Sequence, residues 1–138
     1  AEGLAPLAVD DARGMIGAGA RALIERGFAA SGVEITPDRL ERHFQEFLVH
    51  YGANLCNESR LFPHVAEALD TLAGEGFVLA VCTNKVEAHS VALLDALGVG
   101  SRFAAVCGRD TFPWFKPDPR HLTLTIEKAG GAMEGSLM

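Results

Sequence analysis

Three polar residues, Thr83, Asn84 and Lys85, directly follow the unbroken apolar run 77–82. An apolar run of this length without alternation is typical of a parallel strand that is covered on both faces. The three residues therefore bring a hydroxyl, a side-chain amide and a cation to the end of a strand, just before a predicted helix. Unpaired backbone N–H groups at a helix N-terminus attract anions, and Thr83 can add a hydroxyl donor. This pattern predicts an anion site, although Thr83 or Asn84 could equally well serve only to cap the helix.

A second residue whose side chain could take part in binding or catalysis is Lys116, which lies beyond a short apolar run at 103–107. Pro117 and Pro119 flank Asp118, and their rings stiffen the backbone around the cation and the carboxylate. An isolated lysine is usually a solvated surface charge. A lysine on a stiff loop past a strand end is better placed to hold a phosphate or to screen crowded carboxylates.

The elements that must position these groups alternate along the second half of the chain. The sequence predicts a short helix after Pro63, the strand at 77–82, a helix over 86–97, the strand at 103–107 and a last helix over 121–129. Leu137 and Met138 have the pattern expected for the opening of a further strand. Helices that alternate with apolar strands are typical of βαβ units and a parallel sheet. Ligands of such sheets gather beyond the carboxyl ends of the strands.

The first 57 residues, by contrast, contain helical patterns and no predicted strand. One helix is expected from Asp10 to about Phe28, with interruptions at Gly14, Gly17 and Gly19. Each glycine costs about 1 kcal/mol relative to alanine, which suggests a bend, a close helix contact or a backbone that approaches a ligand. A second helix is expected over 37–55. The sequence therefore predicts a helical domain over 1–57 and an α/β domain over 58–138.

Composition and charge argue against several classes of function. The chain has 138 residues, of which 49% are hydrophobic and 22% charged, and its formal net charge is -6. This acidic balance argues against a nucleic-acid partner, because such binding needs a basic surplus to displace counterions. No apolar stretch of about 18 residues occurs, and a membrane span is not predicted. Three cysteines without CxxC spacing favour buried thiols in a reducing cytoplasm over a disulfide framework or a zinc site.

The order and spacing of three segments resemble those of the haloacid dehalogenase (HAD) superfamily, and most closely its phosphoglycolate phosphatases. These segments are the strand ending in Thr83-Asn84-Lys85, the loop Lys116-Pro117-Asp118-Pro119 and the entry segment Leu61-Phe62-Pro63-His64-Val65. The segment 14–20 is similar to the glycine-bearing helix of the family's cap. The resemblance implies an α/β fold: an HAD-like Rossmannoid parallel sheet core, incomplete here, with an N-terminal helical cap domain.

The resemblance also implies roles for individual residues. Thr83 matches the family's second motif. By this resemblance, the Thr83 hydroxyl and the Asn84 backbone N–H both bind the phosphoryl group that is transferred. Lys116 matches the third motif, which pairs with the phosphoryl group and with the nucleophilic carboxylate. The cap residues expected to face the substrate are Gly17, Gly19 and Arg21.

Two motifs of the family have no counterpart in this sequence. The first, Asp-x-Asp-x-Thr, supplies the nucleophile and the acid–base group and is expected before residue 1. The fourth supplies Mg²⁺ ligands and is expected directly after Leu137-Met138. The chain also begins with Ala rather than Met. We therefore expect an inactive segment of a longer phosphatase, with Mg²⁺ as the cofactor and its ligands outside the segment.

The predicted activity of the whole protein is Mg²⁺-dependent hydrolysis of a small phosphate monoester, such as 2-phosphoglycolate, through an aspartyl-phosphate. Two kinds of alternative stay open. One is a different HAD member, namely a sugar-phosphate phosphatase, a phosphomutase or a dehalogenase. The other is a non-catalytic HAD-derived module that binds a partner. The expected ligand is a small phosphorylated metabolite of the cytoplasm, and the sequence is compatible with a homodimer.

Overall fold

The computed structural model describes residues 2–15 and 19–138. The chain divides into two compact units, 1–53 and 54–138. The boundary lies slightly before residue 57, where the change of sequence pattern placed it.

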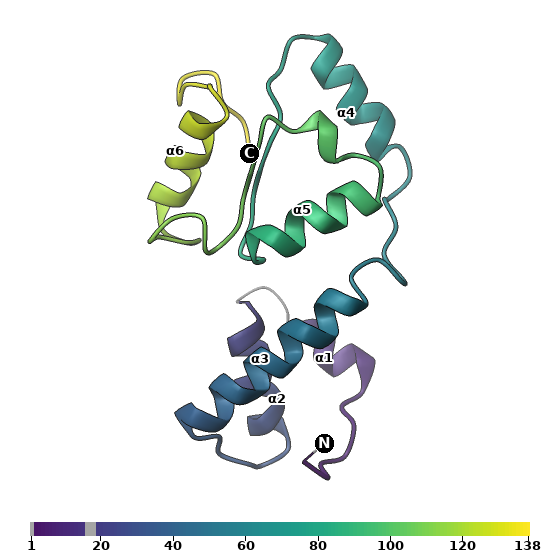
Figure 1. Cartoon of the computed structure of the whole chain (residues 1–138), viewed down its shortest axis with the longest axis vertical. Helices are drawn as coiled ribbons and strands as arrows, with labels where there is room; N and C mark the ends of the chain where they lie inside the picture. The colour runs from purple at the N-terminus through teal and green to yellow at the C-terminus, as the bar shows by residue number, and fades with distance from the viewer. Residues whose placement is uncertain (1, 16–18) are drawn as a thin grey trace. The chain divides into compact units, whose positions relative to one another are not determined.

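The described residues of the N-terminal unit form the helices α1 (Val9–Met15), α2 (Ala20–Ala30) and α3 (Pro37–Ala53) (Figure 1). The prediction of one helix from Asp10 to Phe28 is wrong, because two helices divide this segment. Gly19, which precedes α2, has a φ of 93°, a left-handed backbone that an α-helix does not allow. Gly17, another of the predicted interruptions, lies outside the described residues.

The core of the N-terminal unit forms where α2 packs on α3. Phe28 and Phe44 are its buried apolar side chains among the residues described. The His43 ring lies 5.3 Å from the Phe28 ring, centroid to centroid, and covers it. Glu2 accepts hydrogen bonds from Arg39 at 2.7 Å and from His43 at 2.8 Å, which ties the start of the chain to α3.

The C-terminal unit contains α4 (Val65–Gly74), β1 (Ala80–Cys82), α5 (Glu87–Ala96), the 3₁₀ turn η1 (Gly100–Arg102), β2 (Ala105–Cys107) and α6 (Pro119–Lys128). The two strands pair in parallel. Helix α5 connects them, and α5 and α6 lie on opposite sides of the strands (Figure 1). The predicted parallel α/β arrangement is confirmed, with the helix positions close to those expected.

Both strands are shorter than the sequence predicts. β1 begins at Ala80 rather than at residue 77, and the side chains of Phe77 and Val78 are 45% and 59% exposed. In the described part of the chain, β1 pairs with β2 alone. A continuous apolar run becomes a fully buried strand only when neighbours cover it. Leu137 and Met138 likewise form no strand and are exposed, because a strand needs a partner for its backbone groups.

The core of the C-terminal unit lies between the strands and their helices. Its buried apolar residues, among those described, are Val99, Ala105 and Cys107. Cys107 is completely buried and carries a free thiol, as the sequence predicted for a small apolar residue in a strand. Helix α6 contributes His121 and Thr125, which are polar yet almost completely buried.

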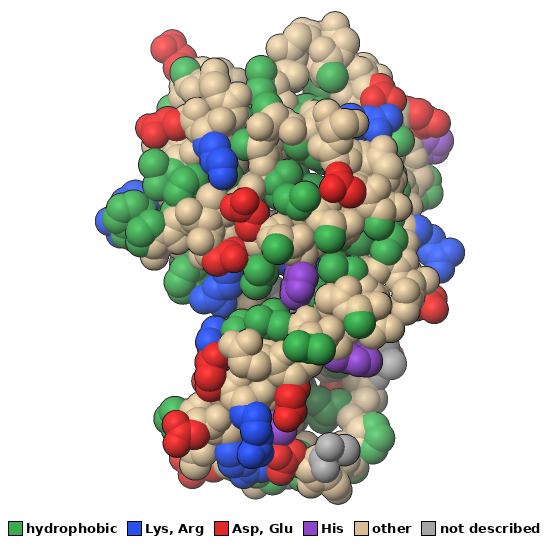
Figure 2. All heavy atoms as spheres, in the orientation of Figure 1, with side chains coloured by type: hydrophobic (Ala, Val, Ile, Leu, Met, Phe, Trp, Pro, Cys, Tyr) green, Lys and Arg blue, Asp and Glu red, His purple; other side chains and the backbone are tan. Residues whose placement is uncertain are grey.

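The surface is mixed in charge. On the face drawn in Figure 2, Lys and Arg side chains lie among Asp and Glu side chains rather than in one continuous basic patch. None of the helices within the described ranges is long and apolar enough to cross a membrane.

Candidate functional site

The loops that follow β1 and β2 emerge at the same edge of the sheet, because the strands are parallel and Cys82 pairs with Cys107. The Thr83 backbone N–H donates to the Cys107 carbonyl at 2.9 Å. The Arg109 backbone N–H donates to the Lys85 carbonyl at 3.0 Å. These two hydrogen bonds join the loops directly beyond the strands.

Gly108 allows the two loops to approach this closely. A Cβ at this position would lie 2.2 Å from the Glu87 backbone nitrogen and 2.7 Å from the Lys85 carbonyl oxygen. Any side chain would therefore push the loop after β2 away from the start of α5. The role of Gly108 could not be predicted from the sequence, because this contact joins residues far apart in the chain and no local pattern records it.

The Thr83 side chain turns toward its own loop. Its hydroxyl oxygen accepts a hydrogen bond from the Lys85 backbone N–H at 3.1 Å. This contact uses one acceptor position of the hydroxyl and leaves its proton to be donated to another group. Thr83 can therefore donate a hydrogen bond to an anion that binds beside the loop.

The start of α5 is capped from the other loop rather than by Thr83 or Asn84. The helix begins at Glu87, whose backbone N–H donates to Asp110 Oδ1 at 2.8 Å. The prediction of an unpaired, anion-binding helix terminus is wrong at Glu87, because a carboxylate already occupies this position. Asp110 was not assigned this role from the sequence, since the cap comes from outside the helix and its preceding loop.

The Asn84 side chain links the loop after β1 to the loop that carries Lys116. Its Nδ2 donates a hydrogen bond to the Lys116 carbonyl oxygen at 3.0 Å. The Oδ1 atom at the other end of the amide is buried and has no hydrogen-bond partner within the described part of the chain. The structure thus joins the loop of Thr83 and Asn84 to the backbone of Lys116, and the expected phosphate-binding roles of these three residues stay a prediction.

The loop around Lys116 is ordered by local contacts. The Asp118 backbone N–H donates to the Phe115 carbonyl at 3.0 Å, which closes a turn around Lys116 and Pro117. The Lys116–Pro117 peptide bond is cis. The Arg109 guanidinium lies 4.3 Å from the centroid of the Phe115 ring, which connects the turn to the loop after β2. Lys116 itself is half-buried.

Asp118 serves as the N-cap of α6. Its Oδ1 accepts from the Arg120 backbone N–H at 2.9 Å, and its carboxylate pairs with the Arg120 guanidinium at 2.6 Å. These hydrogen bonds from Arg120, the side-chain one above all, lower the pKa of Asp118 to about 2. Asp118 is therefore an ionised residue that caps α6.

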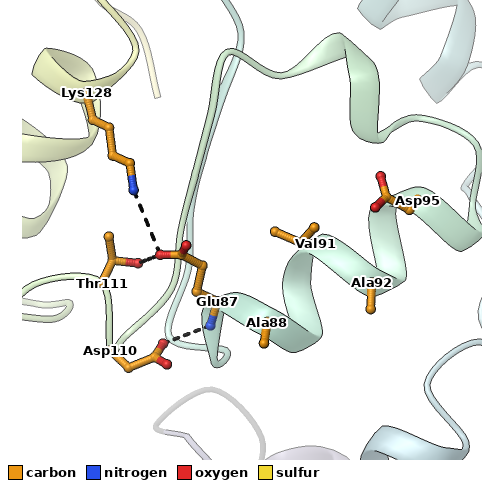
Figure 3. Close-up of a pocket in the computed structure, with 8 residues that line it drawn as sticks. All are labelled: Glu87, Ala88, Val91, Ala92, Asp95, Asp110, Thr111 and Lys128. Atoms are coloured by element: carbon orange, nitrogen blue, oxygen red, sulfur yellow. Dashed lines mark hydrogen bonds and ion pairs between the residues drawn. The ribbon is translucent and has the colours of Figure 1, made fainter.

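A shallow groove of about 830 Å³ runs along α5 and is drawn in Figure 3. Side chains of α5 line it together with Asp110, Thr111 and Lys128. The Glu87 carboxylate accepts a hydrogen bond from the Thr111 hydroxyl and lies 4.0 Å from Lys128 Nζ. Three carboxylates line the groove, those of Glu87, Asp95 and Asp110, against one ammonium group. This charge balance is wrong for a phosphate, and the cluster of Thr83, Asn84 and Lys116 is the better candidate.

The remaining predicted site residues belong to the N-terminal unit. Gly17 lies outside the described residues, and Gly19 lies directly before α2. The Arg21 guanidinium forms an ion pair with Glu41 and lies 3.7 Å from the centroid of the Phe44 ring. Arg21 is thus held against α3, and its expected contact with a substrate stays a prediction.

The fold and the sequence can be compared with known proteins. A profile of the haloacid dehalogenase-like hydrolases matches residues 2–138. The chain belongs to this family. Two curated relatives in it are phosphoglycolate phosphatases, one from Agrobacterium fabrum that is 45% identical over 138 residues and one from Mesorhizobium japonicum that is 47% identical over 133 residues. These alignments cover 100% and 95% of this HAD chain, which spans only 59% of the length of either relative.

A solved structure supports the same assignment. The crystal structure of a predicted phosphoglycolate phosphatase from Haemophilus somnus 129pt matches the HAD chain with a TM-score of 0.82 and 33% identity. The match covers 94% of this chain and 59% of that one. The resemblance stated from Thr83-Asn84-Lys85 and Lys116-Pro117-Asp118-Pro119 is confirmed, and the short sheet agrees with an incomplete HAD core.

The family implies a metal, which we tested against the residues of this HAD chain. In the ranges that the structure describes, no three or more His, Cys, Asp or Glu side chains are arranged to hold a metal ion. Asp110, in the loop after β2, and Asp118, two residues after Lys116, cap α5 and α6. The described residues therefore do not fit a Mg²⁺ site, and we assign no Mg²⁺ ligand to them.

Proposed function

We propose that the full-length protein carrying this HAD chain is a phosphatase that hydrolyses a small phosphate monoester, first of all 2-phosphoglycolate. The supporting observation is the hydrogen bond from Asn84 to Lys116. It joins the loop with the Thr83 hydroxyl to the loop with the Lys116 ammonium, past the carboxyl ends of two parallel strands. Such donors stabilise the negative charge of a phosphoryl group in its transition state. The names of the two curated relatives support the choice of substrate.

Each residue has a separate role in this proposal. The Thr83 hydroxyl and the Asn84 backbone N–H donate to the phosphoryl oxygens. The Lys116 ammonium neutralises charge on the phosphoryl group and on the nucleophilic carboxylate. The nucleophilic aspartate, which forms the aspartyl-phosphate, and the ligands of the required Mg²⁺ lie outside this chain.

We also propose that residues 1–57 form a cap that closes over the substrate and excludes water from the reaction. Its residues toward the substrate would be Gly17, Gly19 and Arg21. Substitution of Arg21 by alanine in the full-length protein should raise KM more than it lowers kcat. A change in thermal stability with unchanged kinetics would instead assign Arg21 to the packing of α2 on α3, where it pairs with Glu41.

The central test is phosphate release from 2-phosphoglycolate in the presence of Mg²⁺. The full-length protein should turn over, and the purified 138-residue chain should not. Lys116→Ala in the full-length protein should lower kcat by about a hundredfold, because it removes a charge from the phosphoryl site. Lys128→Ala is the matched control, since Lys128 lies at the end of α6 and contacts Glu87 instead. Near-normal turnover by Lys116→Ala would exclude Lys116 from the mechanism.

A substrate panel separates the alternatives within the family and beyond it. Preference for a sugar phosphate would indicate a sugar-phosphate phosphatase, and isomerisation of one without phosphate release would indicate a phosphomutase. Halide release from a 2-haloacid that is insensitive to EDTA would indicate a dehalogenase. Failure to turn over any of these compounds would favour the non-catalytic binding module.

A further inference from the structure

The Asn84 side chain makes a contact that the family resemblance does not explain. The resemblance assigns to Asn84 only its backbone N–H, which a residue of almost any type supplies. The structure adds a side-chain hydrogen bond, from Nδ2 to the Lys116 carbonyl oxygen at 3.0 Å. At the other end of the amide, the buried Oδ1 has no partner in the described part of the chain. A buried acceptor without a partner is costly. The hydrogen bond donated by Nδ2 must therefore be the reason that position 84 holds an asparagine.

The Lys116 carbonyl is a suitable point at which to hold this loop. Pro117, the next residue, has no backbone N–H and cannot donate a hydrogen bond to a neighbouring segment. Beyond it, Asp118 fixes the chain to the start of α6, and its own N–H closes the turn onto Phe115. Between these anchors, the Lys116 carbonyl is bound by Asn84.

We propose that Asn84 is a positioning residue for Lys116. Its side-chain amide holds the Lys116 backbone against the loop after β1, and thereby places the Lys116 ammonium next to the Thr83 hydroxyl in the phosphoryl site. The inference rests on the proposed phosphatase function and deepens it. A lysine side chain has many conformers, and a fixed backbone restricts the volume that its charge can reach.

The first experiment measures the backbone of the loop and needs no activity. In the 138-residue chain, Asn84→Ala should speed hydrogen exchange at the Asp118 backbone N–H about fivefold, as expected for the loss of one hydrogen bond. Exchange at Val99, whose N–H donates to the Leu94 carbonyl in the core, should not change. The matched control is Ser90→Ala, which removes a side-chain hydrogen bond to a backbone carbonyl within α5 and leaves the Lys116 loop intact.

A second variant guards against misfolding of Asn84→Ala. Asn84→Asp keeps the size of the side chain and replaces only the Nδ2 donor by an oxygen, which faces the Lys116 carbonyl unfavourably. It should speed exchange at Asp118 at least as much as Asn84→Ala does. Unchanged exchange at Asp118 in both variants would overturn the proposal.

The second experiment measures kinetics with 2-phosphoglycolate in the full-length protein. Asn84→Ala should lower kcat about tenfold to a hundredfold and change KM less than about threefold. The reason is that a displaced ammonium stabilises the transition state less well, while binding of the substrate in its ground state changes little. Ser90→Ala should leave both constants near their normal values. Faster exchange at Asp118 with an unchanged kcat would overturn the positioning role. If the full-length protein hydrolysed no phosphate ester, the proposed function would fail, while the exchange experiment would still decide whether Asn84 holds Lys116.

Discussion

Gly108 offers the most direct test of how the two strand-end loops are held together. A Cβ at this position would lie 2.2 Å from the Glu87 nitrogen and 2.6 Å from the Glu87 Cα, both of which belong to the backbone of α5. Neither atom can rotate away, as the end of a flexible side chain could. In Gly108→Ala, the loop and the helix must therefore separate by more than about 1 Å to reach ordinary van der Waals contact.

This displacement would break hydrogen bonds whose lengths are known. The Glu87 N–H donates to Asp110 at 2.8 Å, and the Arg109 N–H donates to the Lys85 carbonyl at 3.0 Å. An additional 1 Å weakens both strongly. Two hydrogen bonds of about 1 kcal/mol each, together with the cost of overpacking a buried site, predict a loss of about 3 kcal/mol in the free energy of unfolding.

The assay is urea denaturation of the 138-residue chain followed by circular dichroism. Gly74→Ala is the matched control, because Gly74 ends α4 and a Cβ there has no atom within 4 Å. This control should be neutral or gain up to about 1 kcal/mol, since alanine restricts the unfolded chain. A free energy of unfolding for Gly108→Ala within about 0.5 kcal/mol of the unsubstituted chain would refute the reasoning.

Three further predictions concern single contacts. The pKa of Asp118 is lowered to about 2 from an ordinary value of 3.8, so its ionised form stabilises the fold above about pH 4 and this contribution is lost as the pH falls through about 2. Asp118→Asn should flatten the decline of the thermal midpoint over this pH range, and an unchanged slope would contradict the assignment. The Asp70 carboxylate accepts hydrogen bonds from the Arg102 guanidinium at 2.6 Å and 2.9 Å. Asp70→Asn should lower Tm at low salt but much less in 1 M NaCl, because salt screens exposed ion pairs. An equal loss of Tm in both buffers would argue against an electrostatic contribution. His121 is completely buried, and its two ring nitrogens have no hydrogen-bond partner among the described residues. His121→Leu should therefore leave the free energy of unfolding, measured by chemical denaturation, unchanged or raise it by about 1 kcal/mol. A clear loss would mean that the ring nitrogens do have partners.

The helix positions could be predicted from the sequence because their signals are local. Pro37 begins α3, and the Thr36 carbonyl accepts the hydrogen bond from Leu40 that starts the helix, as expected for a residue at the N-cap. The ends of β1 could not be predicted in the same way. The run that begins at Phe77 is apolar throughout, but whether each residue enters a strand depends on a neighbouring strand, which no short-range pattern specifies.

Residue types also led to the prediction of which groups bind phosphate, and their order along the chain indicated the family. Thr83 and Lys116 were identified because each follows a strand, and parallel strands present their carboxyl ends at one edge. Only the tertiary structure decided how these groups are held: Asn84 binds the Lys116 carbonyl, and Asp110 caps a helix that starts in another segment. The physical reason is that hydrogen bonds form between atoms a few ångströms apart, while periodicity and capping signals extend over only a few residues of the chain.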